Sequence, residues 1–409
     1  MRVPGQSSDN SKATLKGVDG LNNKLDPMRG GPSSQGVAPR TWQLLTEADN
    51  INITDANLMV RRDGYEPFVP GSNITSSFST FAHDRFYVID NGTLMQVTPD
   101  GGLIPLASNL SGPARWAELN DVVFLSVGGD KLCINPDGSV FDWGIPIPFG
   151  GRLHQVGGDL EPGLYQVCFT FIDETGREGG ASQSIPIQVV SGGITVTDIP
   201  TQQDAYTAIY MTTKGAVFRL AAVVPQNTQS ISLTTPVVGR ELVTQFFDPP
   251  PAAILDIAAF EGRIYGAEYD QDADATVVWF SEPIGFHLFN LNSGFFMVPG
   301  RVVVMGAGLE SDSLMLSTET RVFLYNRDGL TQVAEYGSIY GQHIDIGSDK
   351  KLYFWTKRGL CRTSPFENLT ESDVSVPPGI TASGGVIHQH GYTKFVVALK
   401  SGGAAYNKR

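Results

Sequence analysis

Cysteine is scarce in this chain of 409 residues, which contains only Cys133, Cys168 and Cys361. Their number is odd, their spacing is wide, and no pair has the spacing of metal ligands. A disulfide framework and a cysteine zinc site are therefore excluded as the basis of the fold. We expect three buried free thiols in a protein that is made in a reducing cytoplasm.

Long apolar runs are also missing, because no uninterrupted apolar stretch approaches the roughly 18 residues that a transmembrane helix needs. The N-terminal region is polar through residue 40 and lacks the apolar segment of a signal peptide. These two absences predict a soluble protein without a membrane anchor.

The common catalytic motifs are absent as well. The sequence has no Gly-rich phosphate loop ending in Lys-Ser/Thr, no His-Glu-x-x-His and no Gly-x-Ser-x-Gly. Residues 135–143, NPDGSVFDW, match the repeated turn of sialidases only in part. We therefore predict that the chain is not an enzyme and binds no cofactor. A glycoside hydrolase with paired carboxylates is the alternative.

Metal ligands are sparse, and the best candidate is the acidic run of Asp270, Asp272 and Asp274. Alternating carboxylates in a loop can converge on Ca²⁺. However, Ala275 follows where a calcium loop would turn at glycine, and Ser281 stands where its last carboxylate would lie. We predict no metal site and read the run as an exposed acidic hairpin loop.

Basic residues are outnumbered, because 29 Lys and Arg face 42 Asp and Glu for a net charge of −13. Residues 1–40 contain six Lys or Arg and three Asp, so they carry +3 and the rest of the chain carries −16. An acidic body argues against tight binding to nucleic-acid phosphates. It is compatible with a surface past which DNA slides without sticking.

What the sequence does contain is a long series of short strands separated by turns. Residues 84–107 read as strand, Asn91-Gly92 turn, strand, Asp100-Gly101 turn, strand, and residues 118–144 repeat the scheme. The pattern resumes after residue 252 and gives about six units of roughly 30 to 45 residues. This period predicts an all-β fold, a β-propeller of about six blades.

Residues 147–251 interrupt this rhythm. Residues 163–190 form a long alternating hairpin pattern around Glu174–Gly176, and two further strand patterns follow before the proline-rich residues 248–252. This spacing predicts an inserted β-sandwich of immunoglobulin or fibronectin type. The expected domains are an extended N-terminal arm (1–40), the first part of the propeller (41–146), the sandwich (147–251) and the second part of the propeller (252–409).

The arm is rich in Gly, Ser, Pro and Asn, and it has too few large apolar residues to fold alone. Two interpretations stay open. The arm is either a disordered tail or a segment that orders against a neighbouring subunit.

Two stretches carry a resemblance to a known family: GLNNKLDP at residues 20–27 and EADNINITDANLMVRRDGYEPF at residues 47–68. They resemble the head-to-tail stabilisation proteins, also called tail nozzle or tail hub proteins, of tailed double-stranded DNA bacteriophages. The family departs from this chain at Asn52, where an Asp is common. The residues that match the family's motifs are Gly20, Asn22, Asn23, Glu47, Ala48, Asn50, Ile53, Arg61, Arg62 and Gly64.

The resemblance implies a structural virion protein of the phage tail that is assembled in the host bacterial cytoplasm. Its copies would form a hexameric nozzle or hub ring below the portal-adaptor (head-completion) complex. The ring would line the DNA exit channel, stabilise the packaged head and contact distal tail proteins or fibres. Genomic DNA would pass through the lumen during ejection without sequence-specific binding.

Under this interpretation, a few residues are expected at subunit contacts. The arm contacts would be Leu21, Asn22, Asn23 and Leu25. Arg61 and Arg62 would pair with carboxylates at a blade or subunit seam, or else form a solvated hairpin end. The alternative function is a receptor- or glycan-binding propeller module, in which exposed aromatic side chains would stack on sugars.

Overall fold

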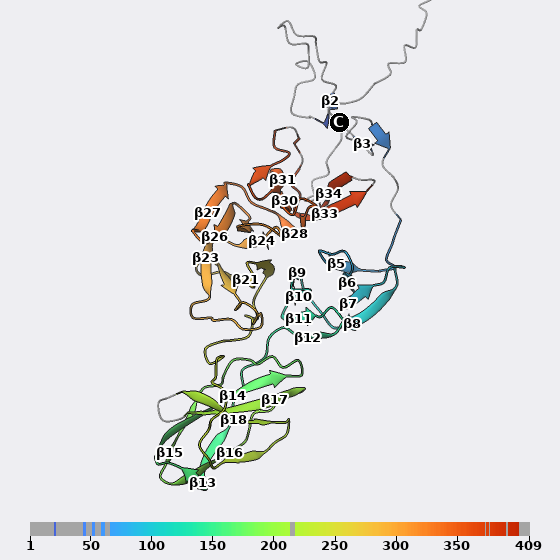
Figure 1. Ribbon diagram of the computed structural model, residues 1–409. Coiled ribbons are helices and arrows are strands. Elements are labelled where there is room, and N and C mark those ends of the chain that lie inside the picture. Colours follow the sequence, from blue (N-terminus) through green and yellow to red (C-terminus); the bar gives the residue numbers. More distant parts are fainter. Residues whose placement is uncertain are drawn as a thin grey trace, which may run out of the picture.

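The chain folds into a β-propeller with an inserted β-sandwich, as the computed structural model shows (Figure 1). This confirms the predicted fold class. The structure describes residues 20–21, 44–45, 51–53, 59–61, 66–212, 217–372, 374–375, 377–389 and 392–400. Apart from Gly20–Leu21, the expected arm lies outside these residues. Within them every regular element is a strand, and no helix is long and apolar enough to cross a membrane.

Six small sheets, here called blades 1 to 6, form the propeller ring. Blade 1 consists of β5 (Ile74–Ser79), β6 (Phe86–Asp90), β7 (Thr93–Val97) and β8 (Leu103–Ala107). Blade 2 consists of β9 (Ala114–Leu119), β10 (Val122–Val127), β11 (Asp130–Ile134) and β12 (Val140–Asp142). Blade 3 consists of β20 (Asp256–Phe260), β21 (Arg263–Asp270), β22 (Ala275–Phe280) and β23 (Phe295–Pro299).

The remaining blades close the ring. Blade 4 consists of β24 (Val302–Gly306), β25 (Leu314–Thr318), β26 (Val322–Asn326) and β27 (Gly329–Ala334). Blade 5 consists of β29 (Ile344–Ile346), β30 (Leu352–Thr356), β31 (Gly359–Arg362) and β32 (Glu367–Asn368). Blade 6 differs, because its sheet holds three strands: β28 (Tyr340–Gln342), paired in parallel with β33 (Thr381–Gln389), and β34 (Tyr392–Lys400).

Tight turns explain why the strands are short. Asn91 and Gly92 both have positive φ angles, 49° and 72°, between β6 and β7. Two successive positive φ angles give the turn whose twist matches that of an antiparallel hairpin, and Asn-Gly is the favoured pair for it. The hairpin predicted at this position is therefore present.

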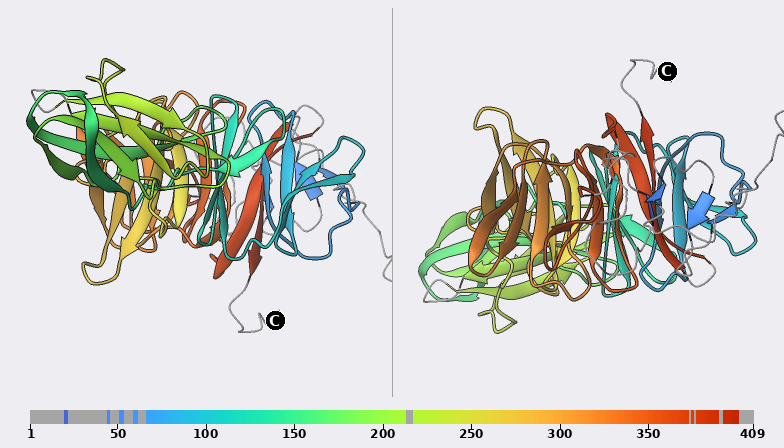
Figure 2. Two further views of the ribbon diagram at one scale, coloured as in Figure 1. Left: turned by 90° about the horizontal axis from the view of Figure 1, so that it is seen from below. Right: turned by 90° about the horizontal axis from the view of Figure 1, so that it is seen from above.

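Apolar clusters fill the spaces between neighbouring blades. In β10, every residue from Val123 to Val127 is buried, because blade 1 covers one face of the strand and blade 3 the other. Similar clusters join blades 3 and 4, blades 4 and 5, and blades 5 and 6. The core of the propeller is thus a series of interfaces around a ring, as Figure 1 shows along the ring axis and Figure 2 from the side.

The sandwich lies outside the ring, next to blades 2 and 3 (Figure 1). One sheet has the order β13 (Arg152–Leu160), β16 (Gly192–Thr197), β19 (Ser230–Leu233). The other has the order β15 (Ile185–Val189), β14 (Gly163–Asp173), β17 (Ala205–Thr212), β18 (Phe218–Val224). Their facing side chains form a separate apolar core around Phe169, Ile194 and Ile209.

Among the residues that the structure describes before the propeller, four short strands occur. Strand β1 (Gly20–Leu21) pairs in parallel with β2 (Leu44–Leu45). Strand β3 (Ile51–Ile53) pairs with β4 (Met59–Arg61) as an antiparallel hairpin.

Candidate functional site

The innermost strands of the blades surround a central channel with a volume of about 790 Å³. All six blades contribute residues to its lining. The channel lining contains three carboxylates, Glu118, Asp256 and Asp345. They are the candidates for acid–base chemistry in the channel.

Asp256 connects three blades. Its carboxylate lies 3.2 Å from the Arg115 guanidinium of blade 2 and accepts the backbone N–H of Met305 in blade 4 at 2.7 Å. It also accepts the N–H of Ile257, the next residue in blade 3. Burial raises the pKa of Asp256 to about 6, although Arg115 and the two N–H donors act in the opposite direction. These three contacts join blades 2, 3 and 4 beside the channel.

Glu118 and Asp345 have equivalent roles. Glu118 of blade 2 accepts the N–H of Phe81, in the loop after β5 of blade 1, at 2.7 Å. Burial raises the pKa of Glu118, against the hydrogen bond from Phe81 and the charge of Arg85. Asp345 of blade 5 accepts the N–H of Val386 in blade 6 at 2.8 Å. These carboxylates therefore join adjacent blades, and none of the three is without hydrogen-bond donors.

The cysteines offer no nucleophile. All three are free and buried, which confirms the prediction. Burial raises the pKa of Cys133 and of Cys168 to about 12 and that of Cys361 to about 11. A thiol with such a pKa stays protonated near neutral pH and does not act as a thiolate nucleophile.

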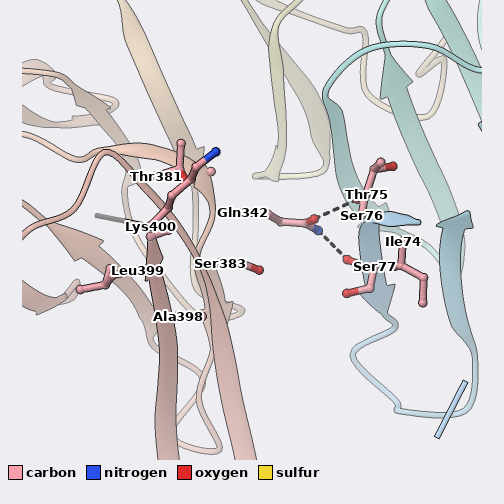
Figure 3. Close-up of a pocket in the computed structure, with 12 residues that line it drawn as sticks. Ile74, Thr75, Ser76, Ser77, Gln342, Thr381, Ser383, Ala398, Leu399 and Lys400 are labelled. Atoms are coloured by element: carbon pink, nitrogen blue, oxygen red, sulfur yellow. Dashed lines mark hydrogen bonds between the residues drawn. The ribbon is translucent and has the colours of Figure 1, made fainter. Parts of the chain in front are cut away.

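A second cavity of about 520 Å³ lies between blade 6 and blade 1, and we call this interface the seam (Figure 3). Figure 3 shows Gln342, from β28, reaching across it toward β5. Its side-chain amide donates to the carbonyl of Ser77 and accepts the hydroxyl of Ser76. Ser76 in turn accepts the indole N–H of Trp116 in blade 2. A chain of polar contacts therefore connects blades 6, 1 and 2.

Replacing Gln342 with alanine is expected to lower the free energy of unfolding by about 1–2 kcal/mol, because it removes two hydrogen bonds across the seam. Chemical denaturation of the full chain measures this. The matched control is Gln332→Ala, which removes an exposed glutamine from β27 on the far side of the ring. An equal loss in both variants would contradict a special role for Gln342.

The sandwich is fastened to blades 2 and 3 by its β14 hairpin. Arg177 donates to the carbonyls of Asp142 and Trp143 at the end of blade 2. The imidazole Nε2 of His287, in the loop before β23, lies 3.0 Å from the carbonyl oxygen of Glu178. The sandwich base is thus bonded to two blades.

The Glu178 side chain continues this network inside the sandwich. Its carboxylate accepts the hydroxyls of Thr170 and Tyr210 at 2.5 and 2.7 Å and pairs with Arg240 at 2.7 Å. Because Arg240 belongs to the segment that returns toward blade 3, the network connects the outgoing and returning parts of the chain. The propeller and the sandwich are therefore joined by hydrogen bonds in addition to the two peptide linkers.

The predicted site residues are only partly within the described chain. Asn22, Asn23, Leu25 and Arg62 lie outside the described residues. Leu21 belongs to β1, and Arg61 ends β4 with an exposed side chain. Their expected roles at subunit contacts stay predictions.

The acidic run forms the turn between β21 and β22. Asp270 accepts the backbone N–H groups of Asp272 and Ala273, and Asp274 accepts the hydroxyl of Tyr269. Within the described residues, no three His, Cys, Asp or Glu side chains are grouped as metal ligands. The carboxylates of this run therefore shape a turn.

Each tryptophan that the structure describes donates its indole N–H to another group of the protein. Trp143 donates to the carbonyl of Phe286 at 2.8 Å, and Trp279 donates to the carboxylate of Glu268 at 3.0 Å. Trp116 donates to Ser76, as described above, and Trp355 donates to a loop carbonyl. They pack the blades together, and Trp42 lies outside the described residues. Nothing in these four positions resembles an open stacking surface.

No family model matches the sequence, and no curated protein matches it. The fold is similar to that of virginiamycin B lyase from Staphylococcus aureus, at 10% identity over 80% of this chain and 92% of that chain, with a TM-score of 0.35. It is also similar to hydrazine synthase from Kuenenia stuttgartiensis, at 10% identity over 83% and 99%, with a TM-score of 0.34. Regucalcin from Agrobacterium tumefaciens matches at 11% identity over 71% and 83%, with a TM-score of 0.27. Such low identities and TM-scores say nothing about the activity of this chain.

Proposed function

We propose that this chain is a structural subunit of a bacteriophage tail. Its copies form a hexameric nozzle or hub ring below the portal-adaptor complex, which lines the DNA exit channel and stabilises the packaged head. The proposal starts from the motifs at residues 20–27 and 47–68, which resemble those of tail nozzle proteins. That resemblance implies a propeller with an inserted sandwich, and the chain has this architecture.

The observation that carries the proposal is the bonded junction between propeller and sandwich. Arg177 and Glu178 bond the sandwich to blades 2 and 3, which restrains the sandwich against the propeller. A hexamer that sits between the packaged head and the distal tail bears mechanical load along its axis. Such an assembly needs subunits whose two parts do not move against each other. A recognition module on a mobile tether would have no need for such bonds.

Charge and chemistry support the same role. The net charge of −13 suits a surface past which DNA slides, because like charges repel. The channel carboxylates hold the blades together, as Asp256 does between Arg115 and Met305. We therefore propose a subunit without catalytic activity.

Binding of a receptor or glycan is the second candidate. The central channel favours it, since a volume of about 790 Å³ is large enough for a small ligand. Phe81 at the channel is partly exposed and could contact such a ligand. The internal bonds of the described tryptophans argue against a broad sugar-stacking surface.

The mass of the purified full chain, alone and after mixing with portal-adaptor rings, tests the proposal. We expect a monomer that becomes a sixfold ring on the adaptor, because the adaptor supplies the template for assembly. Residues 1–40 should gain protection from protease at the same time. A chain that ignores the adaptor rings but binds glycans would establish the second candidate instead.

A further inference from the structure

The central channel exposes apolar side chains in the middle of the ring. Its volume of about 790 Å³ lies within the range of about 300–1,000 Å³ that is typical of small-molecule pockets. Leu309 is 51% exposed, Phe81 39% and Val396 37%, and all three line the channel. Further partly exposed apolar residues of the lining are Phe78, Phe86, Trp116, Ile346 and Ile387. Contact between apolar surface and water is unfavourable, so the channel favours an apolar occupant.

Two glycines of β33 leave part of the channel wall without side chains. A Cβ atom at Gly384 would lie 2.4 Å from the carbonyl oxygen of Val396, and one at Gly385 would lie 2.9 Å from a carboxylate oxygen of Asp345. That carboxylate is held in place by the backbone N–H of Val386. Such close approach of neighbouring groups requires glycine. Larger residues are therefore excluded at two positions of the lining, and blade 6 cannot fill the channel from there.

The charged side chains of the lining already have partners within the protein. They are Arg115, Glu118, Asp256, Asp345 and Lys350. Arg115 and Asp256 pair with each other, Lys350 pairs with Glu310, and the other two carboxylates accept backbone N–H groups. The two histidines of the lining, His83 and His388, bond to hydroxyl groups. An ionic ligand would have to compete with these contacts, so a neutral ligand is favoured.

The channel meets the seam cavity at three uncharged polar side chains. Ser77, Gln342 and Ser383 line both spaces, so the two adjoin (Figure 3). Ser77 and Ser383 are exposed, and their hydroxyl groups can donate to an oxygen of a ligand. A ligand can therefore place one uncharged polar group at this point and its apolar body against Phe81 and Val396.

We propose that the central channel binds a neutral small molecule with an apolar body and at most one hydroxyl or carbonyl group. All six blades contribute to the lining, so the ring would surround such a molecule. A peptide would bring backbone N–H and C=O groups into contact with apolar side chains, and a glycan would bring several hydroxyl groups. The inference does not depend on the proposed tail function, and its ligand differs in class from the glycan of the second candidate.

Photolabelling of the full chain with benzophenone tests the proposal, because this neutral aromatic ketone has the proposed chemistry and bonds to nearby C–H groups on irradiation. We expect saturable labelling of the peptides that contain Phe81, Leu309 and Val396, and loss of the label in excess 2-naphthol. Displacement by maltose instead would assign the channel to a sugar and overturn the proposal. Labelling without saturation, or preferential labelling of exposed sandwich residues such as Leu164, would overturn it as well.

A charge placed in the channel gives a second measurement. Val396→Asp should raise the benzophenone concentration for half-maximal labelling about tenfold, because a bound apolar molecule would desolvate the new carboxylate. Val223→Asp is the matched control, since Val223 is a valine of the sandwich that is 48% exposed, and it should leave this concentration unchanged. Equal labelling of the two variants would contradict the proposal. If the Val396 variant fails to fold, Phe81→Ala should raise the same concentration, and an unchanged value would count against the channel.

Discussion

Replacing Trp143 with alanine is expected to lower the free energy of unfolding by about 3–5 kcal/mol, the typical cost of truncating a buried aromatic residue. Trp143 follows β12 and is completely buried. Its ring contacts those of Phe124 and Phe289, with centroids 5.3 and 5.8 Å away, and its indole N–H donates to the carbonyl of Phe286. The substitution leaves a large cavity between blades 2 and 3 together with an unpaired carbonyl.

Urea denaturation followed by far-ultraviolet circular dichroism measures this loss in the full chain. The matched control is Phe149→Ala, which removes an aromatic side chain that is 97% exposed six residues further along. The control should change the free energy of unfolding by less than about 0.5 kcal/mol, as is usual for surface positions. A Trp143 variant as stable as the Phe149 variant would show that this cluster is not a main contributor to the core.

Local patterns were enough to predict the strands and the turns. The Asn91-Gly92 pair indicates a hairpin because both residues readily adopt the positive φ angles that the tight turn needs. This preference depends only on the two residues themselves. The series of strand-and-turn units predicts about six blades without fixing their exact number, and the insertion follows from the change in spacing. Strand β28 could not be predicted, because Tyr340–Gln342 pairs with strand β33, whose residues lie about 40 positions later in the chain. A three-residue strand carries too little pattern to reveal a partner at that distance.

The interactions of the channel also lie beyond local patterns. Asp256 bonds to Met305, 49 residues away, and Glu118 bonds to Phe81, 37 residues away. The sequence around a single acidic residue in a strand does not indicate which distant backbone N–H group it will bond. The acidic run around Asp270 shows the opposite case. Its spacing has something of a calcium loop, but the missing glycine and last carboxylate predict an exposed acidic turn, and Asp270 accepts two backbone N–H groups in that turn.

The junction between propeller and sandwich leads to the second large effect. Replacing Glu178 with alanine is expected to lower the free energy of unfolding by about 2–4 kcal/mol, because buried polar partners would lose their acceptor. The hydroxyls of Thr170 and Tyr210 are both buried and both donate to this carboxylate. The Arg240 guanidinium is half exposed, so water compensates part of the lost ion pair.

A graded series separates these contributions in the same denaturation experiment. Glu178→Gln keeps one oxygen acceptor and removes the charge, so we expect a loss of only about 1 kcal/mol. Glu174→Ala, at an exposed position of the same hairpin, is the matched control and should have almost no effect. The Glu178→Ala variant should also be cleaved faster by protease in the linkers at 143–151 and 244–255, because the sandwich base loosens. Equal behaviour of the Glu174 and Glu178 variants would contradict a stabilising role for this carboxylate at the base of the sandwich.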